Sequence, residues 1–133
     1  MQIVDLPEVG GFFKPSANAD ADALLIEVEQ FEPMRPNKFK GEVDTIHANV
    51  TVFKDGEEPV THSRVQINHA GLVRKLQGIV GQATVQRLGT RKTEKGHDAW
   101  VWMDPEPVAK QRAIEWAKAM DEAADDAPDF DDD

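Results

Sequence analysis

Hydrophobic and polar residues alternate along the first half of the chain in a pattern that predicts β-strands. Leu24, Ile26 and Val28 take every second position in the first of these segments, which is the period of a strand with one buried face. A longer alternation covers residues 41 to 53, and its apolar positions are Ile46, Ala48, Val50 and Val52. We therefore expect a first strand near residues 24 to 29 and a long second strand with one buried face.

The pattern continues with a hairpin, a short helix, two strands and a second helix. Asp55-Gly56 is typical of a hairpin turn, and residues 60 to 67 supply the returning strand. Asn68 can cap a short helix over residues 69 to 77. A fourth strand is expected over residues 79 to 88 and a fifth over 99 to 103, joined by a polar loop. Pro105 suits a helix start, and the residues that then repeat on one face are Ala109, Ala113, Trp116, Ala117 and Met120.

Five strands with a short helix between the third and the fourth are the element order of the OB-fold, a partly open five-stranded barrel. We therefore expect a mainly β protein with an OB-fold domain over residues 22–104. An N-terminal arm over 1–21 precedes this domain, and a C-terminal helix over 105–120 and a disordered acidic tail over 121–133 follow it. The length of 133 residues and the hydrophobic fraction of 40% suffice for one such domain. Another small α+β fold is the alternative that the pattern leaves open.

Charge is distributed unevenly along the chain. The net charge is −10, but residues 121 to 133 contain eight acids and no base, so the remainder has a charge of −2. Residues 35 to 95 contain eleven bases and six acids. The chain thus has a basic middle and an acidic end, which favours a polyanionic partner for the middle.

The basic residues occur where OB-folds bind oligonucleotides, which is on the face of strands two and three and in the loops after strands one and four. Lysine and arginine neutralise phosphates, and aromatic rings stack on the exposed bases of single strands. The candidate DNA-binding residues are Arg35, Lys38, Phe39, Lys40, Phe53, Arg64, Arg87, Arg91, Lys92, Lys95, Trp100 and Trp102. Basic loops that only maintain solubility are the alternative interpretation.

Trp100 and Trp102 share one face of the fifth strand. The small side chains of Ala99 and Val101 suit a barrel interior, which predicts outward tryptophans that stack on bases. The alternative that at least one of the two tryptophans is buried stays open, because tryptophan is highly buried on average.

Residues 125 to 133 are six aspartates together with Ala127, Pro128 and Phe130. Such a segment cannot bury enough apolar area to fold. We interpret Pro128 and Phe130 as a partner-binding peptide whose phenylalanine fills a pocket with basic surroundings; a tail that only aids solubility is the alternative.

Several classes of protein are disfavoured by what the sequence lacks. There is no cysteine, so disulfides and thiolate metal sites are excluded, and the four histidines are scattered. We find no nucleophile motif or phosphate loop, so we expect no enzyme activity, no cofactor and no metal. No segment approaches the roughly 20 apolar residues of a membrane span, and no signal peptide is evident. We expect a cytoplasmic protein without a membrane partner, and a homo-oligomer remains compatible with the sequence.

Two stretches of the sequence carry a family resemblance. They are Gly10-Gly11-Phe12-Phe13-Lys14-Pro15 and residues 81 to 105, which include Gly89-Thr90-Arg91-Lys92 and Ala99-Trp100-Val101-Trp102. Through them the whole chain resembles the single-stranded-DNA-binding proteins of bacteriophages, in which an OB-fold precedes an acidic tail. The tail is similar to that of bacterial members, although theirs ends on the phenylalanine and here three aspartates follow Phe130.

The resemblance implies sequence-independent binding of single-stranded DNA in phage replication and recombination, in the cytoplasm of the host. It also implies that the tail recruits replication or recombination proteins. The alternative functions are an OB-fold protein-interaction module and an acidic DNA mimic. A mimic would distribute carboxylates over its folded surface, whereas the middle of this chain is basic.

Overall fold

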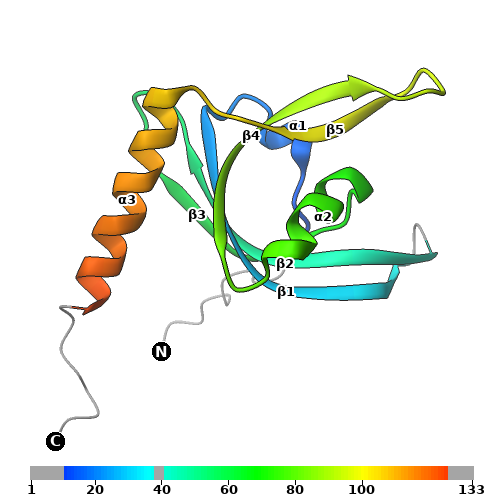
Figure 1. Cartoon of the computed structure of the whole chain (residues 1–133), viewed down its shortest axis with the longest axis horizontal. Coiled ribbons are helices and arrows are strands. Elements are labelled where there is room, and N and C mark those ends of the chain that lie inside the picture. The colour runs from blue at the N-terminus through cyan, green and yellow to red at the C-terminus, as the bar shows by residue number, and fades with distance from the viewer. Residues whose placement is uncertain (1–10, 38–40, 126–133) are drawn as a thin grey trace, which may run out of the picture.

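Five antiparallel strands form one sheet in the order β3-β2-β1-β4-β5, in a computed structural model that describes residues 11–37 and 41–125 (Figure 1). The sheet curls into a half-barrel, an arrangement consistent with an OB-like fold. In chain order the elements are α1 (Pro15–Asn18), β1 (Ala23–Asn37), β2 (Gly41–Phe53), β3 (Val60–Ile67), α2 (Ala70–Leu76), the 3-10 helix η1 (Gln77–Ile79), β4 (Ala83–Lys92), β5 (Asp98–Met103) and α3 (Pro107–Asp125). The mainly β architecture, the short helix between the third and fourth strands and the C-terminal helix are confirmed.

The fourth strand is shifted along the chain from its expected position. It begins at Ala83 rather than at Ile79, because the preceding residues form a turn with Gly81 at φ +85°. The Gly81 amide donates to the Val28 carbonyl oxygen at 2.8 Å, and the Val28 amide donates to that of Gln82 at 2.9 Å. These bonds fasten the turn to β1. At its other end β4 reaches Lys92, so residues 89–92 of the expected polar loop are strand and the remainder forms the turn of the β4–β5 hairpin.

Both long hairpins extend from the half-barrel to the same side (Figure 1). β1 and β2 pair from Ala23↔Phe53 to Asn37↔Gly41, with register shifts between Val28 and Gln30 and between Glu32 and Arg35. Such bulges bend a strand and increase its twist. β4 and β5 pair from Arg87↔Met103 to Lys92↔Asp98.

The main core fills the inside of the half-barrel, as the alternation in β1 and β2 predicts. Its buried strand residues include Leu24, Ile26, Ile46, Val50 and Ile67. The buried face of α2 plugs the barrel with Leu72, Val73 and Leu76. The expected cap residue is wrong by one position, since His69 precedes α2 as the N-cap and makes no side-chain capping bond.

The N-terminal segment is part of the fold from Gly11 onward, not a separate arm. The Gln66 amide donates to the Gly11 carbonyl oxygen and the Phe13 amide donates to that of Gln66, both at 2.9 Å. Phe13 is buried, and its ring centroid lies 6.1 Å from that of Trp102. Because no backbone pairing joins β3 to β5 within the described residues, this segment spans the gap between the two edges of the sheet.

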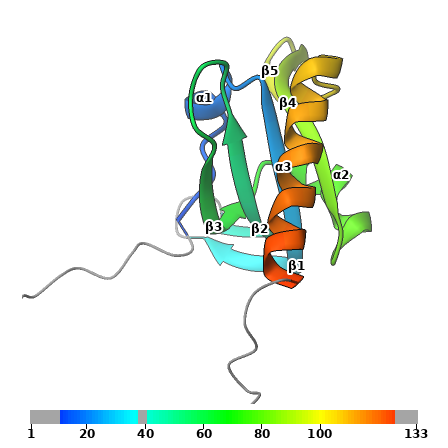
Figure 2. The same ribbon diagram turned by 90° about the vertical axis from the view of Figure 1, so that its left-hand side faces the viewer.

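A second apolar cluster holds α3 against the outer face of the sheet, as Figure 2 shows from the side. Ala23, Leu25 and Phe53 come from the sheet, and Ala113 and Trp116 come from α3. The Phe53 and Trp116 rings meet edge to face, with centroids 5.7 Å apart.

The C-terminal helix is longer than expected. It continues to Asp125, so Asp121, Glu122 and Asp125 belong to α3 and not to a tail. Its last turns leave the sheet, since Met120 is 48% exposed. Pro128 and Phe130 lie outside the described residues, as do residues 1–10 and 38–40. None of the helices in the described part of the chain combines the length and apolar character needed to cross a membrane.

The buried ring of Phe53 yields a stability prediction. Phe53→Ala should lower the free energy of unfolding by about 3 to 5 kcal/mol, because it removes a ring that is 0% exposed and leaves a cavity under α3. Urea unfolding followed by circular dichroism measures this change.

The matched control is Val108→Ala, which also shortens an apolar side chain but at a position that is 84% exposed on α3. It should change the free energy of unfolding by less than about 0.5 kcal/mol. Equal effects of the two substitutions would show that α3 does not depend on this contact.

Candidate nucleic-acid interface

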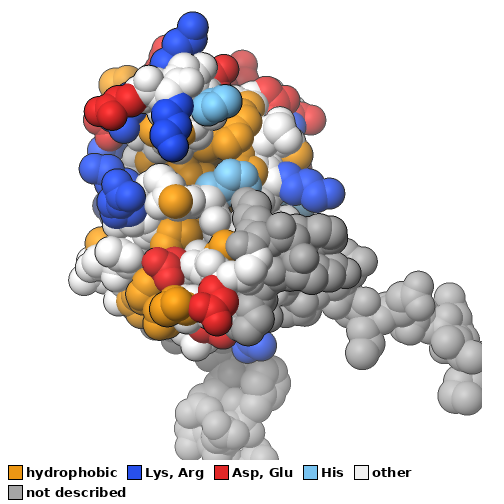
Figure 3. All heavy atoms as spheres, turned by 90° about the vertical axis from the view of Figure 1, so that its right-hand side faces the viewer, with side chains coloured by type: hydrophobic (Ala, Val, Ile, Leu, Met, Phe, Trp, Pro, Cys, Tyr) orange, Lys and Arg blue, Asp and Glu red, His pale blue; other side chains and the backbone are white. Residues whose placement is uncertain are grey.

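The surface between the two projecting hairpins combines cationic and apolar side chains. Figure 3 views this side of the molecule and shows lysine and arginine at its top and margins around hydrophobic and histidine side chains. Aspartate and glutamate side chains also lie at the margins and in the lower part of this face. The β4–β5 hairpin forms the upper border and the β1–β2 hairpin the lower border (Figure 1). We refer to this surface as the hairpin face.

Three of the predicted DNA-binding residues lie at the end of the β4–β5 hairpin. Arg91, Lys92 and Lys95 are all exposed. The turn that joins the strands is ordered by its own bonds, since the Thr93 amide donates to the His97 carbonyl oxygen at 2.7 Å. Within the described part of the chain, none of these three cations forms an ion pair. Their charge is therefore available to an anion, although Glu94 and Asp98 reduce it locally.

Strand alternation divides these cations between the two sides of the hairpin. Lys92 stands opposite Asp98, and Thr90 stands opposite Trp100, on the side that continues into the core. Arg91 stands opposite Ala99 on the other side. Lys92 is thus on the same side of the hairpin as the two tryptophans.

The expectation that Trp100 and Trp102 point outward is wrong, and the alternative of burial is confirmed. Both are partly buried and pack against the main core. The Trp102 Nε1–H donates to the Leu72 carbonyl oxygen at 3.1 Å, which fixes that ring against α2. Met103 and Val101 take the outward positions instead. A base can reach only the part of these rings that α2 leaves uncovered.

Two further cations, Arg74 and Lys75, lie on the exposed face of α2. Arg74 lines a pocket of about 320 Å³ together with Glu42 and Asp44 of the β1–β2 hairpin, so acids offset part of its charge. Neither residue is among the DNA-binding residues predicted from the sequence, although the sequence places them side by side on the polar face of an expected helix.

The first predicted loop is mostly outside the described residues. Lys38, Phe39 and Lys40 lie in the gap, and Arg35 pairs with Val43 as part of β1, with nothing described of its side chain. The described part of this hairpin is acidic.

The outer face of β1, β2 and β3 differs from the basic binding face expected for strands two and three. Asn49 Nδ2 donates to Glu29 Oε1 at 2.8 Å, and His47 Nε2 lies 2.9 Å from Glu32 Oε1. Glu27 is exposed on the same face. Arg64 is exposed at a bulge with φ +53°, where its amide donates to Asn49 Oδ1. The glutamates of β1, placed beside β2 by the strand register, outweigh this one arginine.

Two predicted DNA-binding residues lie away from the hairpin face. Phe53 does face outward from the sheet, but α3 covers it completely, so its ring cannot stack on a base. Arg87 is half-buried and lines a pocket near the start of α3 with Asp22, Asp55 and Glu106. The same helix that stabilises the fold therefore removes both residues from the site.

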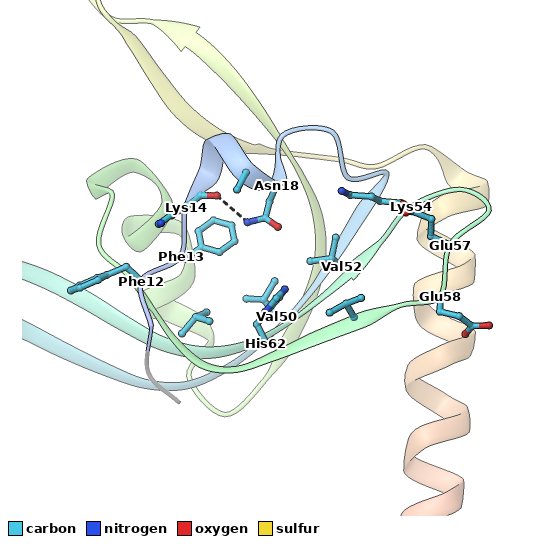
Figure 4. A pocket seen from close by; sticks show the side chains of 13 residues that line it. Phe12, Phe13, Lys14, Asn18, Val50, Val52, Lys54, Glu57, Glu58 and His62 are labelled. Carbon is cyan, nitrogen blue, oxygen red and sulfur yellow. Dashed lines mark hydrogen bonds between the residues drawn. The ribbon is translucent and has the colours of Figure 1, made fainter. Parts of the chain in front are cut away.

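A separate pocket of about 400 Å³ opens into the barrel between β2, β3 and the segment before β1 (Figure 4). Val50, Val52 and Phe13 form its apolar floor, and Lys14 and Glu57 are among its charged lining residues. Among the described residues there is no group of three or more acids or histidines that could hold a metal ion.

Comparison of the chain with protein-family models, with curated proteins and with solved structures finds no match. The functional argument therefore depends on the residues and their geometry.

The cations of the β4–β5 hairpin yield a binding prediction. Replacing Arg91, Lys92 and Lys95 together by Ala should weaken binding of an oligo-dT and flatten the dependence of log K on log salt by about 0.7 for each lost phosphate contact. Fluorescence anisotropy at several salt concentrations measures both quantities.

A charge-matched pair of variants serves as the control. Lys92→Ala with Lys95→Ala removes the same charge as Lys110→Ala with Lys118→Ala, which are exposed positions on α3. Only the hairpin pair should flatten the slope. Equal salt slopes for the two pairs of variants would show either that the phosphates contact other residues or that only the net charge of the protein matters.

Proposed function

We propose that this protein binds single-stranded DNA without sequence preference on its hairpin face. The observation that supports this most directly is the location of the unpaired cations Arg91, Lys92 and Lys95 on a projecting hairpin beside partly exposed aromatic rings. A polyanionic backbone with accessible bases complements such a surface, because phosphates need cations and bases need aromatic faces.

The form of the site favours a single strand over a duplex. A two-stranded ribbon such as the β4–β5 hairpin can enter the major groove of a duplex, where polar side chains read the base edges. The cations of the hairpin face instead surround apolar side chains, which suits a strand whose bases are unstacked. Contacts to phosphates and ring faces do not distinguish bases, so little sequence preference follows.

The biological setting that we propose comes from the sequence resemblance to phage proteins. It is DNA replication and recombination in the host cytoplasm, with an OB-fold as the binding domain and the acidic C-terminus as the segment that recruits partner proteins. Pro128 and Phe130 are the residues proposed to contact such a partner.

One observation favours the alternative of an acidic DNA mimic. Glu27, Glu29 and Glu32 lie on one outer strand face, and a mimic would present such carboxylates to another protein's DNA site. The binding assay separates the two functions, since a mimic would not bind an oligonucleotide itself.

The proposed function predicts a preference between two forms of DNA. The full chain should bind fluorescent oligo-dT more tightly than a duplex of equal length, at low salt and at 0.1 M salt. Equal or tighter binding of the duplex would contradict the proposal, and binding of neither would favour the mimic.

The C-terminal acids yield a further prediction. Deleting residues 126–133 removes five acids and leaves α3 intact. A tethered polyanion has a high effective concentration and competes with DNA for the cations. The deletion should therefore tighten binding of oligo-dT most at low salt, because the screening length falls from about 30 Å at 0.01 M to about 10 Å at 0.1 M.

The substitution Phe130→Ala is the control because it keeps every charge. It should leave DNA affinity unchanged and weaken binding of a partner protein. If the deletion weakens DNA binding instead, the tail contributes to the binding site or to the fold.

A further inference from the structure

The segment before α1 exposes an aromatic ring that the proposed function has not used. Phe12 is 56% exposed, and it is the only aromatic residue among the exposed large hydrophobic residues of the described chain. Its neighbour Phe13 is buried at 5% exposure. Two adjacent phenylalanines therefore have opposite environments, as expected for an extended segment with one side toward the core.

The backbone around Phe12 is held rigidly against β3. Phe12 forms a parallel bridge with Gln66, through the carbonyl oxygen of Gly11 and the amide of Phe13. The next residue, Phe13, is anchored by the packing of its ring on Trp102. An exposed ring on a fixed backbone has little conformational entropy to lose when a ligand covers it.

Figure 4 shows the direction in which Phe12 points. Phe12 is among the residues that line the barrel pocket, and its ring points outward, toward the side on which the β1–β2 hairpin extends. Lys14 extends toward the same side, two residues along the segment. The β1–β2 hairpin is the lower border of the hairpin face, so this ring and this cation point toward the side of the molecule on which that face lies.

The other described aromatic residues are less suited to stacking. Phe53 is fully buried, and Trp100, Trp102 and Phe31 are only partly exposed because they pack on the main core. Trp116 is also only partly exposed, because it packs on the second apolar cluster. A base needs one open ring face of its own size, and Phe12 offers the most exposed ring.

We propose that Phe12 stacks on a base of the bound single strand and that Lys14 contacts a neighbouring phosphate. This inference rests on the proposed function and identifies a contact residue for the same site. The backbone bridge to Gln66 positions the ring, and it uses no atom of the Phe12 side chain. Substitution of that side chain should consequently leave the fold intact.

The test compares three substitutions of Phe12 in the full chain, with fluorescent oligo-dT as the probe. Phe12→Ala and Phe12→Leu should each weaken binding about 5- to 150-fold, the effect of losing one stacked base. Phe12→Trp should retain the affinity and add a tryptophan emission that the oligonucleotide quenches. Leucine keeps the apolar volume without a π-face, so its effect separates stacking from hydrophobic contact.

Salt dependence distinguishes the proposed role of Phe12 from that of Lys14. Phe12→Leu should leave the salt slope unchanged, whereas Lys14→Gln should flatten it by about 0.7. Thermal unfolding of each variant verifies the fold, and Val108→Ala controls for the loss of an exposed apolar side chain elsewhere.

Two negative outcomes have different meanings. If the wild type binds oligo-dT and Phe12→Leu binds equally well, the stacking role of Phe12 is overturned while the proposed function stands. If the wild type binds no oligonucleotide, the proposed function fails and this inference fails with it.

Discussion

A curled sheet whose first and last strands do not pair leaves a gap between its edges, and closing that gap is the constraint on which this structure depends. The edges here are β3 and β5. The bridge from Gly11 and Phe13 to Gln66 covers the β3 edge, and Phe13 then reaches Trp102 on β5. α2 fills the same opening from another direction, with Leu72 accepting the Trp102 hydrogen bond. Three segments far apart in the sequence thus close one core.

This means of closure also decides which side chains remain for a ligand. The indole rings of β5 are partly used to seal the core, and the adjacent phenylalanines divide the roles of anchor and exposed ring. On the opposite side of the sheet, α3 covers Phe53 and borders Arg87. The hairpins extend past these covered regions. Their ends therefore keep exposed side chains that the core does not need.

The sequence predicts the fold well where polar and apolar residues alternate cleanly. In β2 the polar neighbours of Ile46, Val50 and Val52 define which face is buried, and the structure agrees. In β5 the residues are apolar at both parities, so alternation cannot tell which side of the strand faces the core. The position of α2 decides which side of β5 faces the core, through the hydrogen bond between Trp102 and Leu72, which are 30 residues apart in the sequence. Local patterns contain no information on such long-range packing.

The same distinction applies to the candidate site. The hairpin cations Arg91, Lys92 and Lys95 could be found from the sequence, because a polar turn between two strands is exposed in almost any packing. The positions of Phe53 and Arg87 outside the site could not be predicted, because covering of the outer face by α3 depends on tertiary contacts. The charge of the β2 face is not predictable from residues 35 to 95 for a related reason. Its neighbours in the sheet are the glutamates of β1, which precede that part of the sequence.

A net charge of −10 is compatible with a DNA-binding surface because charges act over a limited distance in salt. The screening length is about 10 Å at 0.1 M. The acids of α3 lie on the side of the molecule opposite the two hairpins (Figure 1), so a phosphate at the β4–β5 hairpin is mainly influenced by the charges beside it. At low salt the distant acids act as well, and the whole molecule then repels a polyanion. Affinity for a single strand thus depends on two opposing terms, local attraction and global repulsion, of which salt suppresses the longer-ranged repulsion first.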